Sequence, residues 1–182
     1  SGNPGPALNK ALNRADELGP TIPWEMYDHV HFVAHSAGSR LISRLAEWAR
    51  SVPSGPPVHA TYLDAYAGIT WYNGSGVVAD LMEYYGQYAH WADQYYSQEN
   101  LGFGACGGFG VQTQRLLPNA FNVDVSALDQ QWNPPDCLST HTWPRCFYNH
   151  SAFGSVGPNP PCSMPPTALY QPYGFALGYE RW

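Results

Sequence analysis

The feature that most constrains the fold is the order of three segments between residues 30 and 64. Residues 30–34 (VHFVA) are a short, mainly apolar run typical of a buried strand, and residues 35–38 (HSAG) follow without a spacer. From residue 39 the apolar side chains recur at helical spacing, with Leu41, Ile42 and Leu45 on one face. A second apolar run covers residues 58–63 and ends on Asp64. A strand, a helix and a strand in this order predict two parallel strands with a right-handed crossover, and therefore an α/β fold.

Further elements are expected on both sides of this unit. Residues 6–18 carry an apolar helical face, and Gly19-Pro20 supplies a stop signal. Residues 78–97 are predicted to be helical, and residues 120–125 (AFNVDV) to form a third strand. A short helix is expected near residues 147–153. The 182 residues are assigned to one domain, residues 1–182, because their number is typical of a single core.

A serine lies at the predicted junction between the first strand and the helix. In Ala34-His35-Ser36-Ala37-Gly38, the residues two before and two after the serine are small. Such a tight turn lifts a serine hydroxyl clear of the sheet, where it can act as a nucleophile. The amide of Ala37, at the helix start, would then face a developing oxyanion. The alternative is that Ser36 only caps the helix.

Three segments resemble those of lipases and esterases of the α/β-hydrolase family. Residues 30–42 (VHFVAHSAGSRLI) resemble the nucleophile turn of that family, although the family more often has glycine where Ala34 stands. Residues 61–65 (TYLDA) resemble the segment that carries the catalytic acid in pancreatic-type lipases. Residues 141–148 (HTWPRCFY) are similar to the catalytic histidine segment of those lipases. The resemblance implies a partial α/β-hydrolase fold, with a mostly parallel sheet, flanking helices and long disulfide-bearing loops, and a triad in the order Ser36, Asp64, His141.

Other residues compete for the acid and the base. Asp64 ends the strand that follows the helix, on the sheet edge where α/β sites are built, whereas Asp124 and Asp129 are the alternative acids. Among the seven histidines, His141 and its alternative His150 fall in the late loop region. The other five are not expected to reach the serine hydroxyl, because they lie in or before the first predicted strand and its turn, at the start of the second strand, or in the predicted helix: His29, His31, His35, His59 and His90.

Charge and cysteine usage narrow the function classes. The net charge is −6 and no basic run occurs, so nucleic-acid binding is not expected. No apolar run approaches the roughly 18 residues of a membrane span. The second half holds four cysteines, which predict disulfides of undetermined pairing rather than a metal site: Cys106, Cys137, Cys146 and Cys162. Together with glycosylation triplets at Asn73 and Asn149, they predict a secreted glycoprotein.

These observations lead to one expected function and one alternative. The expected function is hydrolysis of carboxylic esters, with an ester or lipid as substrate and without a cofactor or metal. The alternative is a non-catalytic secreted binding protein on the same scaffold. Only 35 residues precede Ser36. The earlier strands of the family fold, and the second oxyanion donor, are therefore expected from a missing N-terminal segment or a partner chain.

Overall fold

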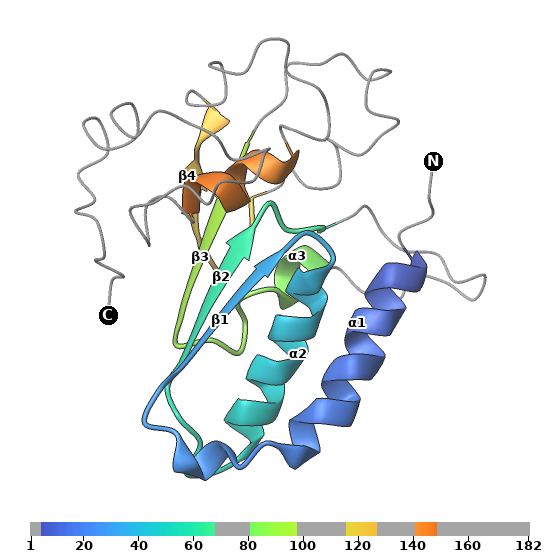
Figure 1. Ribbon diagram of the computed structural model, residues 1–182. Coiled ribbons are helices and arrows are strands. Elements are labelled where there is room, and N and C mark those ends of the chain that lie inside the picture. Colours follow the sequence, from blue (N-terminus) through green and yellow to red (C-terminus); the bar gives the residue numbers. More distant parts are fainter. Residues whose placement is uncertain (1–4, 68–80, 98–115, 127–140, 149–182) are drawn as a thin grey trace.

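The described residues contain four strands, which form one parallel sheet in sequence order (Figure 1). The computed structural model describes residues 5–67, 81–97, 116–126 and 141–148. The strands are β1 (Val30–His35), β2 (Val58–Leu63), β3 (Trp91–Tyr96) and β4 (Phe121–Asp124). Each strand pairs in parallel with the next, so the carboxyl ends of all four lie at one edge. The predicted α/β class and the parallel pairing of the first two strands are confirmed.

The helices that precede and follow β1 pack on one face of the sheet (Figure 1). They are α1 (Gly5–Leu18) and α2 (Gly38–Ser51), and the chain turns between α1 and β1 through the 3-10 turns η1 (Gly19–Thr21) and η2 (Trp24–Met26). Both helices begin and end close to the predicted positions. Within the described segments no helix combines the length and apolar composition needed to span a membrane.

The predicted helix over residues 78–97 is wrong. Only α3 (Leu81–Tyr84) is helical there, and β3 occupies the second part of the segment. Gly86 explains the break, because its φ of 85° is left-handed and a Cβ would lie 2.3 Å from the Asn119 carbonyl oxygen. Pairing of residues 91–96 with both β2 and β4 then outweighs the local helical pattern. Residues 78–80 lie outside the described part.

The helical segment expected near residues 147–153 begins earlier in the chain. Residues 141–148 are helical, whereas residues 149–153 lie outside the described ranges. The difference matters for function because His141, expected in a loop, stands in a helix.

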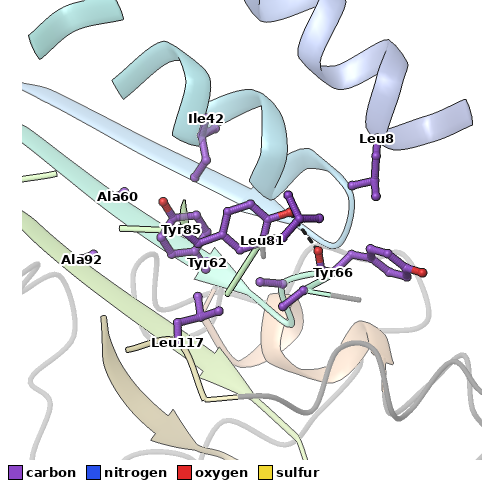
Figure 2. Close-up of a cluster of buried hydrophobic side chains, with 11 residues drawn as sticks. Leu8, Ile42, Ala60, Tyr62, Tyr66, Leu81, Tyr85, Ala92 and Leu117 are labelled. Atoms are coloured by element: carbon purple, nitrogen blue, oxygen red, sulfur yellow. Dashed lines mark hydrogen bonds between the residues drawn. The ribbon is translucent and has the colours of Figure 1, made fainter. Parts of the chain in front are cut away.

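A tyrosine-rich cluster fills the space between the sheet, α2 and α3 (Figure 2). The rings of Tyr62 and Tyr85 stack with centroids 5.4 Å apart. The Tyr62 hydroxyl accepts a hydrogen bond from the Gly86 amide (2.9 Å) and pairs with Ser43 Oγ (2.8 Å). The Tyr85 hydroxyl donates to the carbonyl oxygen of Tyr66 (2.8 Å). Because these buried hydroxyl groups are hydrogen-bonded, the two tyrosine rings are buried without an unpaired polar group and are held in one orientation.

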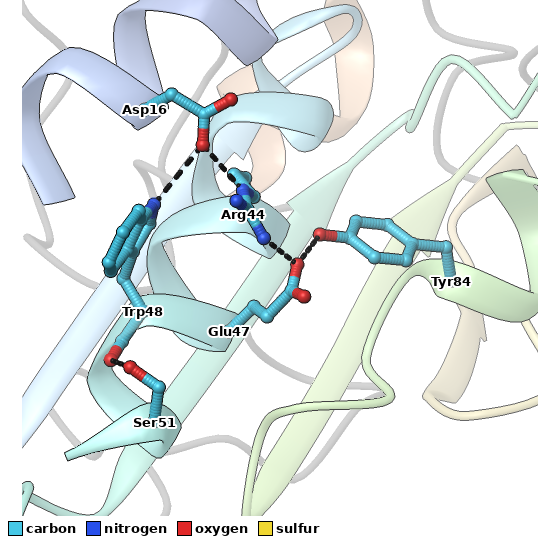
Figure 3. A network of polar contacts seen from close by, with 6 residues as sticks. All are labelled: Asp16, Arg44, Glu47, Trp48, Ser51 and Tyr84. Atoms are coloured by element: carbon cyan, nitrogen blue, oxygen red, sulfur yellow. Dashed lines mark hydrogen bonds and ion pairs between the residues drawn. The ribbon is translucent and has the colours of Figure 1, made fainter.

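A polar network on the outer surface links α1, α2 and α3 (Figure 3). Arg44 of α2 pairs with Asp16 of α1 and with Glu47 of its own helix, each at 2.6 Å. Glu47 in turn accepts a hydrogen bond from the Tyr84 hydroxyl of α3 (2.6 Å). Partly exposed ion pairs of this kind each contribute at most about 1 kcal/mol, so the network fixes helix orientation more than it stabilises the fold.

The helical segment 141–148 packs against the carboxyl-terminal part of the sheet (Figure 1). Trp143 is 1% exposed, and its indole N–H donates to the carbonyl oxygen of Val125 just after β4 (3.1 Å). Phe147 packs against Tyr95 of β3, with ring centroids 5.8 Å apart. This second cluster holds His141 at the edge where the strands end.

Candidate active site

The turn around Ser36 is fixed by main-chain hydrogen bonds. Ser36 has a φ of 56°, and its amide donates to the carbonyl oxygen of Leu63 at the end of β2 (3.0 Å). Its own carbonyl oxygen accepts from the amides of Ser39 (3.1 Å) and Tyr66 (3.2 Å). A left-handed conformation is costly for a residue with a Cβ, by roughly 1–2 kcal/mol. The neighbouring strand and helix therefore hold Ser36 in a conformation that it would not adopt alone.

The small residues that flank the serine are required by this geometry. A Cβ at Gly38 would lie 3.4 Å from the Cβ of Ala34, so the two positions face each other across the turn. A Cβ at Gly38 would thus already be in van der Waals contact with Ala34, so a longer side chain at position 38 has little space on this side of the turn. The spacing of small residues seen in the sequence thus has a direct steric cause.

The first turn of α2 begins immediately after the serine. Ala37 is the N-cap residue, and no side chain makes a capping hydrogen bond there. The helix-side bonds of Ser36 are made by its carbonyl oxygen rather than by its hydroxyl. Since amides at a helix start lack intrahelical acceptors, the Ala37 amide is of the right kind to stabilise a negatively charged oxygen.

Asp64 has the same unusual backbone conformation as Ser36. Its φ is 47°, and Ser36 and Asp64 are the two non-glycine residues with positive φ among the described residues. The Asp64 amide donates to the carbonyl oxygen of Tyr95 (2.8 Å), and the residue is 2% exposed. Ser36 directly follows β1 and Asp64 directly follows β2, and these strands are parallel neighbours. Two strained turns therefore lie side by side at the same edge of the sheet, as is common at functional sites.

His141 is hydrogen-bonded to Asp64. Its Nδ1 lies 2.5 Å from Asp64 Oδ2, and the two side chains are 12% and 2% exposed. A carboxylate at this distance favours the proton on Nδ1, which leaves Nε2 as the basic nitrogen. The structure brings together the acid and the histidine that the resemblance implied, from positions 77 residues apart.

The alternative acid Asp124 has a different environment. It ends β4, is exposed, and its Oδ1 accepts hydrogen bonds from the amide (2.9 Å) and hydroxyl of Ser126. This local turn accounts for the aspartate without a role for histidine. The remaining alternatives, Asp129 and His150, lie outside the described residues.

His35 connects the serine turn to His141. Its Nε2 donates to the main-chain carbonyl oxygen of His141 at 2.8 Å. The two imidazole rings are tilted by 41° with centroids 4.5 Å apart. His141 is therefore next to the residue that precedes Ser36 in the chain. Sequence reasoning set His35 aside as a candidate base, because its side chain was not expected to approach Ser36 Oγ, and gave it no other role. No local pattern predicts its contact with a residue 106 positions away.

The remaining described histidines lie toward the other end of the sheet. His31 and His59 stack with parallel rings 4.0 Å apart, and His31 Nε2 is 2.9 Å from Thr61 Oγ1. His90 was predicted in a helix but precedes β3, where its Nδ1 accepts from the amide of Val58 (2.9 Å). Within the described ranges no group of three metal-ligating side chains is arranged for a metal ion. Of the four cysteines, Cys146 is buried in the second cluster and the others lie outside those ranges.

The partly buried position of His35 has a consequence for stability at low pH. Burial lowers the pKa of His35 from 6.5 to about 4, and the nearby His141 and Arg145 act in the same direction, against the hydrogen bond to His141. The unfolded chain therefore protonates His35 near pH 6.5, whereas the folded chain protonates it only near pH 4. The stabilisation of the folded state by neutral His35 is fully present above pH 6.5, and it is lost as the pH falls from 6.5 to 4.

We therefore expect His35→Gln to flatten the acid side of the stability curve. Between pH 7 and pH 4 the free energy of unfolding should fall by about 2–3 kcal/mol less in the variant than in the wild type. Urea unfolding at several pH values measures the difference. Parallel curves for the two proteins would contradict the assignment of this proton uptake to His35.

Comparison with known proteins identifies no relative of this chain. The chain matches no protein-family model, and no curated protein or solved structure is significantly similar to it. The evidence for the candidate site is therefore the arrangement of its own residues.

Proposed function

We propose that the protein is a serine hydrolase that cleaves carboxylic esters through an acyl-enzyme on Ser36. The observation that carries the proposal is the hydrogen bond between His141 and the buried Asp64, at the same sheet edge as a serine held at a φ of 56°. A nucleophile, a base and an acid that orients the base are the components of a catalytic triad. The proposal includes a partial α/β-hydrolase fold. The parallel sheet supports this assignment, because that fold has a mostly parallel sheet.

In the first half of the reaction, His141 Nε2 accepts the hydroxyl proton of Ser36. The serine oxygen attacks the ester carbonyl carbon, and the carbonyl electron pair moves onto oxygen, which the Ala37 amide stabilises. The tetrahedral intermediate then expels the alcohol, to which His141 returns the proton. The Ser36–His141 hydrogen bond belongs to the proposal; such bonds commonly tighten only when substrate binds.

In the second half, water replaces the alcohol. His141 removes a proton from the water, and the resulting hydroxide attacks the acyl carbon. Collapse of this intermediate releases the carboxylic acid and returns the proton to Ser36. Asp64 stays ionised throughout and stabilises the imidazolium that forms twice in each cycle. The positive charge on His141 is thus always formed 2.5 Å from a carboxylate oxygen.

The setting of the enzyme is part of the same proposal. Disulfides among the four cysteines and glycans at Asn73 and Asn149 would suit a secreted esterase. An ester of a lipid or of another small alcohol is the proposed substrate.

Covalent labelling tests the proposal directly. A fluorophosphonate probe is expected to phosphonylate one serine, because only an activated hydroxyl displaces its fluoride at neutral pH. Mass spectrometry of the digested protein should place the adduct on Ser36. Heat-denatured protein is the control and should not react. An adduct absent from the native protein, or located on another serine, would overturn the proposal.

A further inference from the structure

The main chain of His141 has an anchor outside the triad. The helical segment 141–148 approaches the sheet from another part of the chain, more than 100 residues after β1. Asp64 contacts the ring of His141, which fixes the orientation of the imidazole but leaves the position of the backbone open. A catalytic geometry also requires that the backbone that carries the base be held in place.

We propose that His35 is a positioning residue, whose Nε2–H donates to the His141 carbonyl oxygen and fixes the base relative to Ser36. This inference rests on the proposed function, and it extends the site to a residue that touches neither the reacting atoms nor the acid. His35 suits the task because it precedes Ser36 directly, so the same strand end carries the nucleophile and the anchor of the base. Its ring also packs against the His141 ring, with centroids 4.5 Å apart.

The protonation state of His35 supports this role. Its pKa is lowered to about 4, so at neutral pH the ring is uncharged and carries a single N–H. The 2.8 Å bond to a carbonyl oxygen requires that this hydrogen be on Nε2. A neutral neighbour also leaves His141 free to become positively charged, whereas a charged ring at this distance would oppose the imidazolium. Arg145, on the same helical segment as His141, also opposes a positive charge on His35 and lowers its pKa.

Two substitutions separate the hydrogen bond from the packing of the ring. His35→Phe keeps a planar ring but removes the donor, whereas His35→Gln keeps an N–H donor at a similar reach. His31→Phe is the matched control, because His31 lies on the same face of β1, roughly 13 Å from His35 along the strand. Hydrolysis of p-nitrophenyl butyrate then gives kcat and KM separately.

We expect His35→Phe to lower kcat by about 100-fold with little change in KM, since displacement of a catalytic group by 1 Å has that order of effect. His35→Gln should recover most of the loss, and His31→Phe should keep kcat within about threefold of the wild type. A merely structural role would instead lower the stability of His35→Phe, and the donor restored in His35→Gln would not recover kcat selectively. Wild-type kcat in His35→Phe would overturn the proposal.

A spectroscopic readout keeps this test independent of the proposed activity. A short hydrogen bond between histidine and a carboxylate gives a far-downfield Nδ1 proton resonance, which Asp64→Asn identifies by its loss. The resonance should weaken or vanish in His35→Phe and persist in His35→Gln and His31→Phe. If the wild type hydrolyses no ester but shows this pattern, the proposed function fails and the positioning role stands. An unchanged resonance in His35→Phe rejects the positioning role whatever the activity.

Discussion

Replacement of Ser36 by alanine is expected to lower kcat for ester hydrolysis by about a million-fold, to the level left by binding alone. The physical reason is that the acyl-enzyme cannot form without the hydroxyl, so Asp64 and His141 have no proton transfer to assist. The fold should persist, because the main-chain hydrogen bonds of Ser36 to Leu63, Ser39 and Tyr66 do not involve its side chain. Steady-state kinetics with p-nitrophenyl butyrate measures the effect.

Two further variants distinguish a nucleophile from a structural serine. Ser51→Ala removes a hydroxyl that only bonds the Trp48 carbonyl oxygen at the other end of α2, and it should leave kcat unchanged (Figure 3). Ser36→Gly should abolish activity yet unfold at equal or higher denaturant concentration, because glycine adopts a φ of 56° without a steric penalty. A stabilised, inactive glycine variant is the expected signature of backbone strain kept for function. Loss of stability with activity intact would identify Ser36 as a structural residue.

The local elements of the first half of the chain could be predicted because their patterns are strong and consistent. Residues 58–63 were expected as a strand and form β2 over the same residues. The apolar face of residues 39–51 and the small residues on either side of Ser36 define α2 and the turn before it. In this region local preference and tertiary packing agree, so the sequence is sufficient.

The strand predicted at residues 120–125 is confirmed as β4, but β3 could not be predicted in the same way. Residues 91–96 have polar and aromatic side chains without a clear period, and their strand conformation comes from pairing with β2 and β4. Such pairing depends on neighbours that are distant in the sequence. The contact between His35 and His141 is of the same kind, since it joins residues 106 positions apart. Composition and spacing contain no record of it.

Asp64→Asn is expected to lower kcat by about 10,000-fold while the fold is kept. The amide is nearly the same size as the carboxylate but carries no charge, and its NH₂ group can donate to His141 Nδ1. It would thereby favour the tautomer with the proton on Nε2, so the nitrogen needed to accept the Ser36 proton is no longer basic. The imidazolium also loses the carboxylate that lies 2.5 Å from Nδ1.

Asp124→Asn is the matched control for this substitution. Asp124 also ends a strand of the sheet, but its carboxylate bonds Ser126 and it is exposed. We expect its kcat to stay within about threefold of the wild type, because substitutions at exposed positions away from a site usually change little. The ratio of kcat between the two variants therefore measures the contribution of one carboxylate to the site rather than a general effect of charge removal. Equal losses in the two variants would show that Asp64 acts on the fold or its charge balance, and the histidine at position 141 would then need another partner.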